Sequence, residues 1–217
     1  MKKKTDSYQH QGLRRQLILE LQKKGITDKN VLAVMSKIPR HYFFDEAFLF
    51  HAYEDKAFPI GDGQTISQPY TVAFMTQLLG VKAGDKILEI GTGSGYQASV
   101  LCHLGAAVYS VEYVKNLHLK AAEQLNEFGF SPTLFWGDGS KGLPVHAPYQ
   151  GIIVTAGAPN LPQVLLEQLV VGGRLVIPVG DHERQKMYRY TRVSETKFEQ
   201  EIFNDFSFVP LKGTFGW

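Results

Sequence analysis

Hydrophobic residues in the first 80 positions recur mostly at helical spacing. They predict one amphipathic helix over residues 13–24 and a second that starts at Thr27 or Asp28 and ends at Pro39. The apolar faces would consist of Leu13, Leu17, Leu21, Val31, Val34, Met35 and Ile38. An aromatic stretch over residues 42–53 has no clear period. Residues 58–69 hold two prolines and two glycines and predict an ordered loop, and residues 70–80 predict a third helix.

From Gly84 onward, short apolar segments alternate with helical ones. Five strands are predicted at 86–90, 108–111, 133–136, 151–155 and 174–179. Helices are predicted at 96–104, at 114–128, and from about Pro162 to Gly172-Gly173. Such alternation is typical of a parallel sheet covered by helices on both faces. Two further strands, 186–193 and 201–209, have no helix between them and would add an antiparallel edge.

The expected architecture is therefore α/β: a doubly wound, mostly parallel seven-stranded sheet with an N-terminal helical cap. We expect a single domain over residues 1–217, in which residues 1–80 form the cap and its loop, and residues 81–217 form the sheet region. We also expect a monomer, because no exposed apolar helix face is left over.

The composition is ordinary for a globular chain of 217 residues, with a formal net charge of +2. A charge this near zero gives no electrostatic reason to expect a nucleic acid or membrane partner. No segment approaches the roughly 18 apolar residues of a membrane span, and Lys2-Lys3-Lys4 is expected to be a solvated start rather than part of a signal peptide. Cys102 is the only cysteine, which suits a reducing cytoplasm, and no cluster of His and Cys predicts a metal site.

A glycine loop follows the first strand of the sheet region, with the sequence Glu89-Ile90-Gly91-Thr92-Gly93-Ser94-Gly95. Doubly wound sheets bind ligands beyond the carboxyl ends of their strands, where this loop would lie. Its glycines let the backbone turn tightly and approach a ligand without interference from a Cβ atom. Glu112 follows the second strand, about 20 residues on, and can accept hydrogen bonds from both ribose hydroxyls of an adenosine.

Two ligand classes share this layout. Dinucleotide enzymes space their glycines G-x-G-x-x-G and place a pyrophosphate at the helix N-terminus. Here the spacing is G-x-G-x-G, and Glu89 would repel a pyrophosphate but attract the cationic end of S-adenosylmethionine. We therefore predict an S-adenosylmethionine site, with a nicotinamide site or a tight turn without a ligand as alternatives. Asp138, within Gly137-Asp138-Gly139, either accepts the adenine amino group or bonds its own backbone.

A separate segment closely resembles the signature of the protein-L-isoaspartate O-methyltransferases, especially the bacterial ones. It reads Pro59-Ile60-Gly61-Asp62-Gly63-Gln64-Thr65-Ile66-Ser67-Gln68-Pro69. The segments that also resemble family blocks, in order and spacing, are 88–97, 137–139, 152–156, 172–180 and 208–211. The likeness extends from about residue 13 to residue 211.

The resemblance implies a class I methyltransferase of Rossmann-like fold that uses S-adenosylmethionine and no metal. Its substrates would be damaged proteins and peptides, whose L-isoaspartyl residues it would methylate on the free α-carboxylate. The products would be S-adenosylhomocysteine and a methyl ester that closes to a succinimide and so returns some normal aspartate. Ser67 would be the catalytic position, orienting either substrate or cofactor. The implied cofactor-binding residues are Gln64, Thr65, Ile66, Ser67, Glu89, Gly91, Thr92, Gly93, Ser94, Gly95, Glu112, Asp138 and Gly139.

Some features depart from the family pattern or leave alternatives open. Ala156-Gly157-Ala158-Pro159 replaces a more usual Ala-Ala-Pro-Pro run, and Gln150 stands where the family often has Asp. Residues 181–200 and the tail after Leu211 do not align. Ser67 could instead cap the helix that follows Pro69. A methyltransferase for another carboxylate or a small molecule, or a non-catalytic adenosine-binding module, would keep the glycine loop but not need the 59–69 segment.

Overall fold

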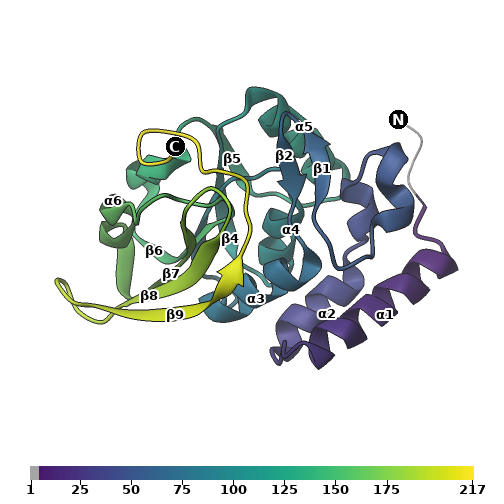
Figure 1. Ribbon diagram of the computed structural model, residues 1–217, viewed down its shortest axis with the longest axis horizontal. Helices are drawn as coiled ribbons and strands as arrows, with labels where there is room; N and C mark the ends of the chain where they lie inside the picture. Colours follow the sequence, from purple (N-terminus) through teal and green to yellow (C-terminus); the bar gives the residue numbers. More distant parts are fainter. Residues whose placement is uncertain (1–4) are drawn as a thin grey trace.

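A seven-stranded sheet forms the centre of the computed structural model, which describes residues 5–217 (Figure 1). The predicted basic start, Lys2-Lys3-Lys4, lies outside the described residues. The α-helices are α1 (Tyr8–Lys23), α2 (Lys29–Lys37), α3 (Pro69–Leu79), α4 (Tyr96–His103), α5 (Lys115–Glu127) and α6 (Gln163–Glu167). The strands are β1 (Phe58–Gly61), β2 (Gln64–Ile66), β3 (Lys86–Ile90), β4 (Ala107–Glu112), β5 (Thr133–Trp136), β6 (Tyr149–Val154), β7 (Leu169–Gly180), β8 (Gln185–Arg192) and β9 (Phe198–Phe206).

The sheet has the order β5-β4-β3-β6-β7-β8-β9. Strands β3 to β7 pair in parallel, whereas β8 and β9 add the antiparallel edge. The predicted α/β, mostly parallel seven-stranded fold is confirmed. The chain leaves β3 toward β4 on one side and returns to β6 on the other, so the carboxyl end of β3 is a topological switch point, where folds of this kind bind ligands.

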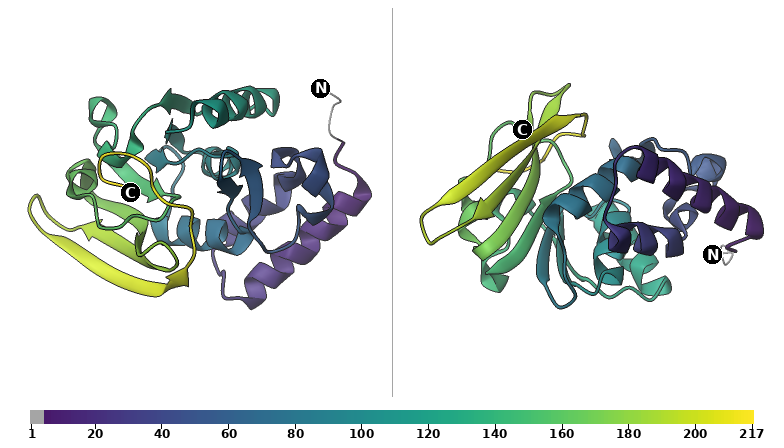
Figure 2. Two further views of the ribbon diagram at one scale, coloured as in Figure 1. Left: turned by 45° about the horizontal axis from the view of Figure 1, so that its top comes forward. Right: turned by 90° about the horizontal axis from the view of Figure 1, so that it is seen from below.

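Two apolar layers cover the sheet. Alternate residues of β3 divide between them, because successive side chains of a strand point to opposite faces: Ile87 packs with α3, α4 and α5, and Leu88 and Ile90 pack with α6 and the C-terminal segment. The first layer continues into α1 and α2, which lie to one side of the sheet in both views of Figure 2. Asp28 begins α2 by accepting hydrogen bonds from the Asn30 and Val31 N–H groups.

Some predicted ends are shifted, since α1 begins at Tyr8 rather than at residue 13 and β9 covers Phe198–Phe206 rather than 201–209. Three further differences concern the kind or extent of an element. Residues 58–66 form the hairpin β1–β2 rather than a loop, and Gly61, Asp62 and Gly63 turn it with φ values of 92°, 53° and 69°. Two 3-10 helices, Arg40–Phe43 and Glu46–His51, overlap the aromatic stretch, and their repeat of three residues matches neither expected period.

The third difference is α6, which ends at Glu167 instead of reaching Gly172-Gly173, because β7 begins at Leu169. The Gln168 carbonyl accepts a hydrogen bond from the Tyr149 N–H (2.8 Å), and its side-chain amide bonds the Lys141 carbonyl (2.9 Å). These tertiary bonds stop the helix. Within residues 5–217, no helix combines the length and the apolar character needed to cross a bilayer.

Candidate active site

A pocket opens at the carboxyl ends of β3, β4 and β6. It encloses about 740 Å³ when the open space at its mouth is included. The predicted residues that line it are Gln64, Thr65, Ile66, Ser67, Gly91, Thr92, Gly93, Ser94, Glu112 and Gly139. Glu89, Gly95 and Asp138 do not line it. The topology thus brings together two segments that are distant in the sequence, the 59–69 signature and the glycine loop.

Gly91 is held where only glycine fits. Its φ is +97°, and a Cβ atom there would lie 2.4 Å from Thr155 Oγ1. The Thr155 hydroxyl donates to the Gly91 carbonyl (2.6 Å), and the Gly91 N–H donates to the Val111 carbonyl (2.8 Å). The loop is therefore fixed between β4 and the residue that follows β6, with its backbone open to the pocket.

Glu112 also lines this pocket. The side chain is buried, and its two oxygens accept hydrogen bonds from the Gly93 and Val114 N–H groups, both at 2.8 Å. These two hydrogen bonds fix the position of the carboxyl group. Each carboxylate oxygen can accept a second bond, so the geometry fits the pair of ribose hydroxyls of an adenosine.

Ser67 does not cap the helix that follows it. The N-cap of α3 is Gln68, and its side chain forms no capping hydrogen bond. Asp55 takes this role from outside the helix, because its Oδ1 accepts a hydrogen bond from the Tyr70 N–H (2.7 Å) while its Oδ2 lies 2.6 Å from Lys24 Nζ. Ser67 lines the pocket instead.

Arg40 is a buried residue that supports Ser67 and that the sequence did not reveal. Its guanidinium donates to the carbonyls of Ser67 (2.9 Å) and Ala52 (3.0 Å) and lies over the Tyr96 ring at 4.7 Å. Burial lowers the pKa of Arg40 to about 10, so it stays charged at neutral pH. A single arginine just before an aromatic stretch carries no sequence signal of burial.

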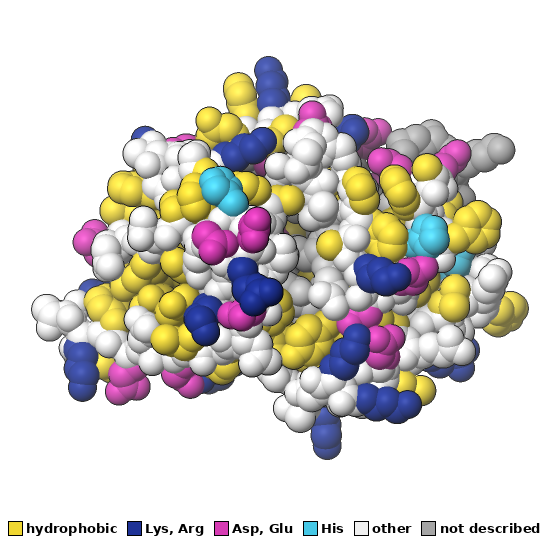
Figure 3. All heavy atoms as spheres, in the orientation of Figure 1, with side chains coloured by type: hydrophobic (Ala, Val, Ile, Leu, Met, Phe, Trp, Pro, Cys, Tyr) yellow, Lys and Arg dark blue, Asp and Glu magenta, His cyan; other side chains and the backbone are white. Residues whose placement is uncertain are grey.

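A second hollow adjoins the pocket and shares Thr65, Ser67, Thr155 and Val209 with it. It encloses about 1490 Å³ including its mouth, and Tyr70 contributes to its wall. The rest of its lining comes from the 183–184 turn, the end of β9 and the residues just after it, together with Ala57, Gln68 and Thr71. The face of the molecule in Figure 3 is hollowed near its middle, with acidic and basic side chains interspersed around it. We call this second hollow the groove.

Asp138 is engaged by the C-terminal tail rather than exposed to the pocket. Its Oδ1 accepts from the Ser140 N–H (3.0 Å) and hydroxyl (2.6 Å), and its Oδ2 from the Thr214 N–H (2.9 Å) and hydroxyl (2.8 Å). Although burial opposes it, these hydrogen bonds hold the pKa of Asp138 below its usual range. Its neighbour Gly139 lines the pocket and has no room for a Cβ atom, which would lie 2.8 Å from Ile90 Cγ2.

Gly157, a departure from the family pattern, has a local explanation. A Cβ atom at this position would lie 2.9 Å from the Gln185 side chain. Gln185 in turn accepts a hydrogen bond from the Phe208 N–H (2.8 Å). The C-terminal segment also bonds the Gly157 backbone. The Val209 carbonyl accepts from the Gly157 N–H (2.9 Å), and the Trp217 indole N–H donates to the Gly157 carbonyl (3.1 Å).

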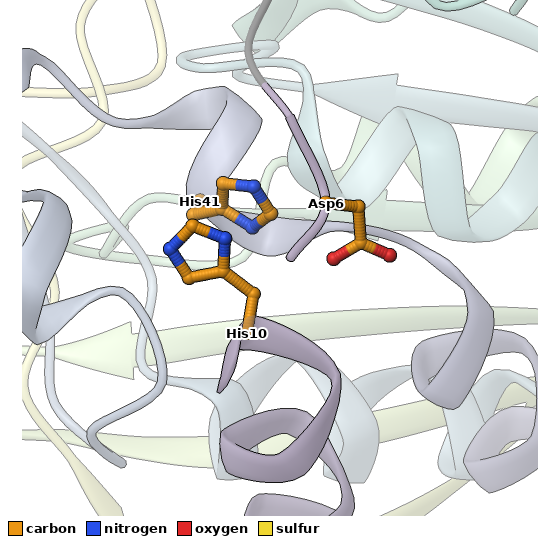
Figure 4. A group of neighbouring side chains, drawn as sticks. All are labelled: Asp6, His10 and His41. Atoms are coloured by element: carbon orange, nitrogen blue, oxygen red, sulfur yellow. The ribbon is translucent and has the colours of Figure 1, made fainter. Parts of the chain in front are cut away.

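Within residues 5–217, one group has ligand atoms near enough to hold a metal: Asp6, His10 and His41 (Figure 4). Arg14, however, donates to both oxygens of Asp6, at 3.0 and 2.9 Å. The His10 and His41 rings stack with 3.8 Å between their centroids, and His41 Nδ1 lies 2.7 Å from the Tyr53 hydroxyl. A cation would have to displace the guanidinium, so the group fits a structural network that anchors the start of α1.

A doubly wound sheet with a G-x-G-x-G loop after one strand and an acidic residue at the end of the next is the arrangement of a class I methyltransferase. The sequence profile described as protein-L-isoaspartate(D-aspartate) O-methyltransferase matches residues 12–215. The chain belongs to this family. Its predicted family, enzyme class and cofactor, S-adenosylmethionine, are thereby confirmed.

Curated relatives agree over almost the full chain. A protein-L-isoaspartate O-methyltransferase from Cytophaga hutchinsonii is 58% identical over 212 residues, which cover 98% of this chain and 96% of the relative. One from Flavobacterium psychrophilum is also 58% identical, covering 95% of this chain and 97% of the relative.

Solved structures show the same fold. One protein-L-isoaspartate O-methyltransferase superposes with a TM-score of 0.83 at 29% identity, over 94% of this chain and 67% of its own. A Plasmodium falciparum structure, in complex with S-adenosyl-L-homocysteine, gives 0.79 at 24% identity, over 92% of this chain and 98% of its own.

Proposed function

We propose that this chain transfers a methyl group from S-adenosylmethionine to the free α-carboxylate of L-isoaspartyl residues in damaged proteins and peptides. The reaction would start their repair through a succinimide. The observation that carries the proposal is Ser67, which lines both the cofactor pocket and the groove. A flexible substrate segment in the groove would bring its carboxylate to the methyl end of the cofactor.

The chemistry asks little of the protein beyond positioning. A carboxylate with a pKa near 4 is already ionised at neutral pH and needs no general base. When bound, S-adenosylmethionine supplies a methyl group on an activated sulfonium. The protein has to align the carboxylate oxygen with that methyl group and exclude water.

We propose separate roles for the residues around the pocket. Glu112 binds the ribose hydroxyls, and the backbone of the 91–95 loop supports the rest of the cofactor. Ser67 donates a hydrogen bond that orients the substrate carboxylate. Arg40 acts as a positioning residue, because its bond to the Ser67 carbonyl (2.9 Å) holds the serine between pocket and groove.

The groove supports a broad choice of substrates. Its walls combine aromatic rings such as Tyr70 with charges of both signs, including Arg184 and Asp205. We propose that the substrate lies extended between the 58–69 segment and Val209-Pro210-Leu211, held largely through its backbone. We further propose that the chain works in the cytoplasm as a monomer, without a nucleic acid or membrane partner. Its charge near zero and its lone cysteine support this.

A pair of peptides tests the function directly. Methyl transfer should occur to a peptide that contains one L-isoaspartyl residue and be at background for the same peptide with normal aspartate. The product should be labile to base and release methanol, as a carboxyl methyl ester does. Equal rates on the two peptides, or no transfer to the isoaspartyl peptide, would contradict the proposed isoaspartyl methyltransferase activity. The Ser131→Ala variant, changed at an exposed position before β5, serves as the protein control.

A further inference from the structure

Glu89 is a fully buried carboxyl group beneath the glycine loop. The Ser110 hydroxyl donates to its Oε2, whereas Oε1 has no hydrogen-bond partner in the described part of the chain. Among residues 5–217, no lysine, arginine or histidine forms an ion pair with it. A buried carboxylate without a cation or a full set of donors is strongly disfavoured, so Glu89 holds its proton while no cation is near.

Two hydroxyl groups connect this carboxyl group to the cofactor pocket. Ser110 Oγ lies 2.6 Å from Thr92 Oγ1. Thr92 belongs to the glycine loop and lines the pocket, although Glu89 itself does not. The chain from Glu89 through Ser110 to Thr92 therefore links a buried titratable group to the place where the cofactor binds, and it offers a path for a proton.

Among the groups that face Glu89, Glu112 opposes its ionisation. Glu112 lies at the end of the neighbouring strand, where two backbone N–H groups donate to its carboxyl oxygens. The Cys102 thiol of α4 is electrostatically coupled to Glu89, and burial raises its pKa to about 12, so it adds no charge at neutral pH. Burial, together with the charge of Glu112 and against the hydrogen bond from Ser110, raises the pKa of Glu89 to about 8.

We propose that Glu89 is a positioning residue that couples cofactor binding to a proton: it ionises when the cationic cofactor binds and takes a proton back once the sulfonium has become a neutral thioether. In the transfer, a lone pair of the substrate carboxylate forms the new O–CH₃ bond, and the pair of the broken S–CH₃ bond stays on sulfur. The proton of Glu89 leaves to solvent on binding and returns from solvent after transfer. The site thus gains a negative charge only while it holds a positive ligand.

The inference rests on the proposed cofactor pocket and predicts a difference between substrate and product. Because ionised Glu89 favours the sulfonium, the affinity for S-adenosylmethionine relative to S-adenosylhomocysteine should rise with pH below about 8. For one coupled proton the rise is at most about tenfold for each pH unit. Above the pKa of Glu89 the ratio should level off.

Calorimetry of the full-length protein tests this. Each ligand is titrated into wild-type protein and Glu89→Gln at pH 7.0, in buffers of different ionisation enthalpy, to count the protons released. Wild-type protein should release up to about one proton more than the variant with S-adenosylmethionine, and no more than the variant with S-adenosylhomocysteine. Any proton that the amino group of a ligand gains or loses on binding is the same for both proteins, so it cancels in the difference between their proton counts. Equal counts from the two proteins would overturn the proposal.

A second variant covers the case in which Glu89→Gln fails to fold. Ser110→Ala removes the hydrogen bond that favours ionised Glu89, so it should move the rise in relative affinity to higher pH. An unchanged pH dependence would count against the proton coupling. If wild-type protein binds neither ligand, the assignment of the pocket to the cofactor is wrong, and the inference about Glu89 is wrong with it. Binding with equal proton counts refutes the inference alone.

Discussion

Single side chains at this site act through the backbone groups that hold them. Glu112 is fixed by two N–H groups, one from the glycine loop and one from the start of the next segment. Its position is therefore set before any ligand arrives, and the entropy of ordering a long side chain is not lost on binding. The same two bonds make Glu112 a part of the loop's structure.

Glu112→Ala should weaken S-adenosylmethionine binding by about 1–3 kcal/mol, because the ribose hydroxyls lose a charged acceptor. Calorimetry measures the loss. Glu123→Ala removes the same charge from an exposed position on α5 and should leave the affinity unchanged. An equal effect of both variants would point to the net charge of the protein rather than to ribose binding.

Ser67→Ala should lower kcat more than it lowers cofactor affinity, because its hydroxyl would contact the substrate carboxylate. The cost of one hydrogen bond to a charged group is about 1.5–3 kcal/mol, or about 10- to 150-fold in rate. Steady-state kinetics with the isoaspartyl peptide and calorimetry with the cofactor separate the two effects. If only the cofactor affinity falls, Ser67 orients the cofactor instead.

Local spacing at this scale identified Glu112 and the glycine loop, because both follow strands at fixed offsets. It could not identify Arg40 or Asp55. Their partners, Ser67 and Tyr70, lie 27 and 15 residues away, and only tertiary packing brings them together. For Glu89 the sequence indicated an acidic group near a cationic ligand, but not its complete burial.

Among the elements, the junction between β2 and α3 matters most, because Ser67 lies within it. Its geometry depends on Asp55, whose side chain is buried and caps α3 from a different segment. The prolines and glycines of residues 58–69 correctly indicated order, but strands of three and four residues are too short for an alternation to show. For α6 and β7, the bonds of Gln168 overrode the helical pattern of the leucines.

Asp55→Ala should destabilise the fold by about 1–3 kcal/mol, since the Tyr70 N–H loses its side-chain acceptor and the Lys24 ammonium group keeps only Glu20 of its two carboxylate partners. It should also lower kcat, because the Ser67 backbone loses support. Urea unfolding and the peptide assay provide the two measurements. Asp45→Ala, at an exposed position with no capping bond, should change neither. A stable Asp55→Ala protein with reduced kcat would still show that Asp55 positions Ser67.

At the scale of the whole molecule, the pocket is formed by segments that are distant in the sequence. Residues from the hairpin, three strand ends and the C-terminal segment line it. The sequence indicated the sheet, because the spacing of hydrophobic residues and the turn residues between them are local features. It gave no role to the tail after Leu211. The structure fastens that tail to Asp138 and Gly157. Such contacts have no local signature.

Deletion of residues 212–217 should lower both thermal stability and cofactor affinity, because Asp138 and Ser140 lose partners beside the pocket wall at Gly139. The melting temperature should fall by about 2–4 °C for each kcal/mol lost. Thr214→Val keeps the tail but removes one donor to Asp138, and should give a smaller fall of the same sign. Unchanged melting and binding in the deletion would show that the tail is dispensable.

The lone cysteine gives the fold an internal reporter. Only the thiolate reacts with disulfide reagents, and a pKa of about 12 keeps Cys102 protonated in the native protein. An unfolded chain would present an ordinary thiol that reacts far faster. The rate at which the protein reacts with such a reagent therefore reports the fraction of molecules in which helix α4 has opened, without any added label.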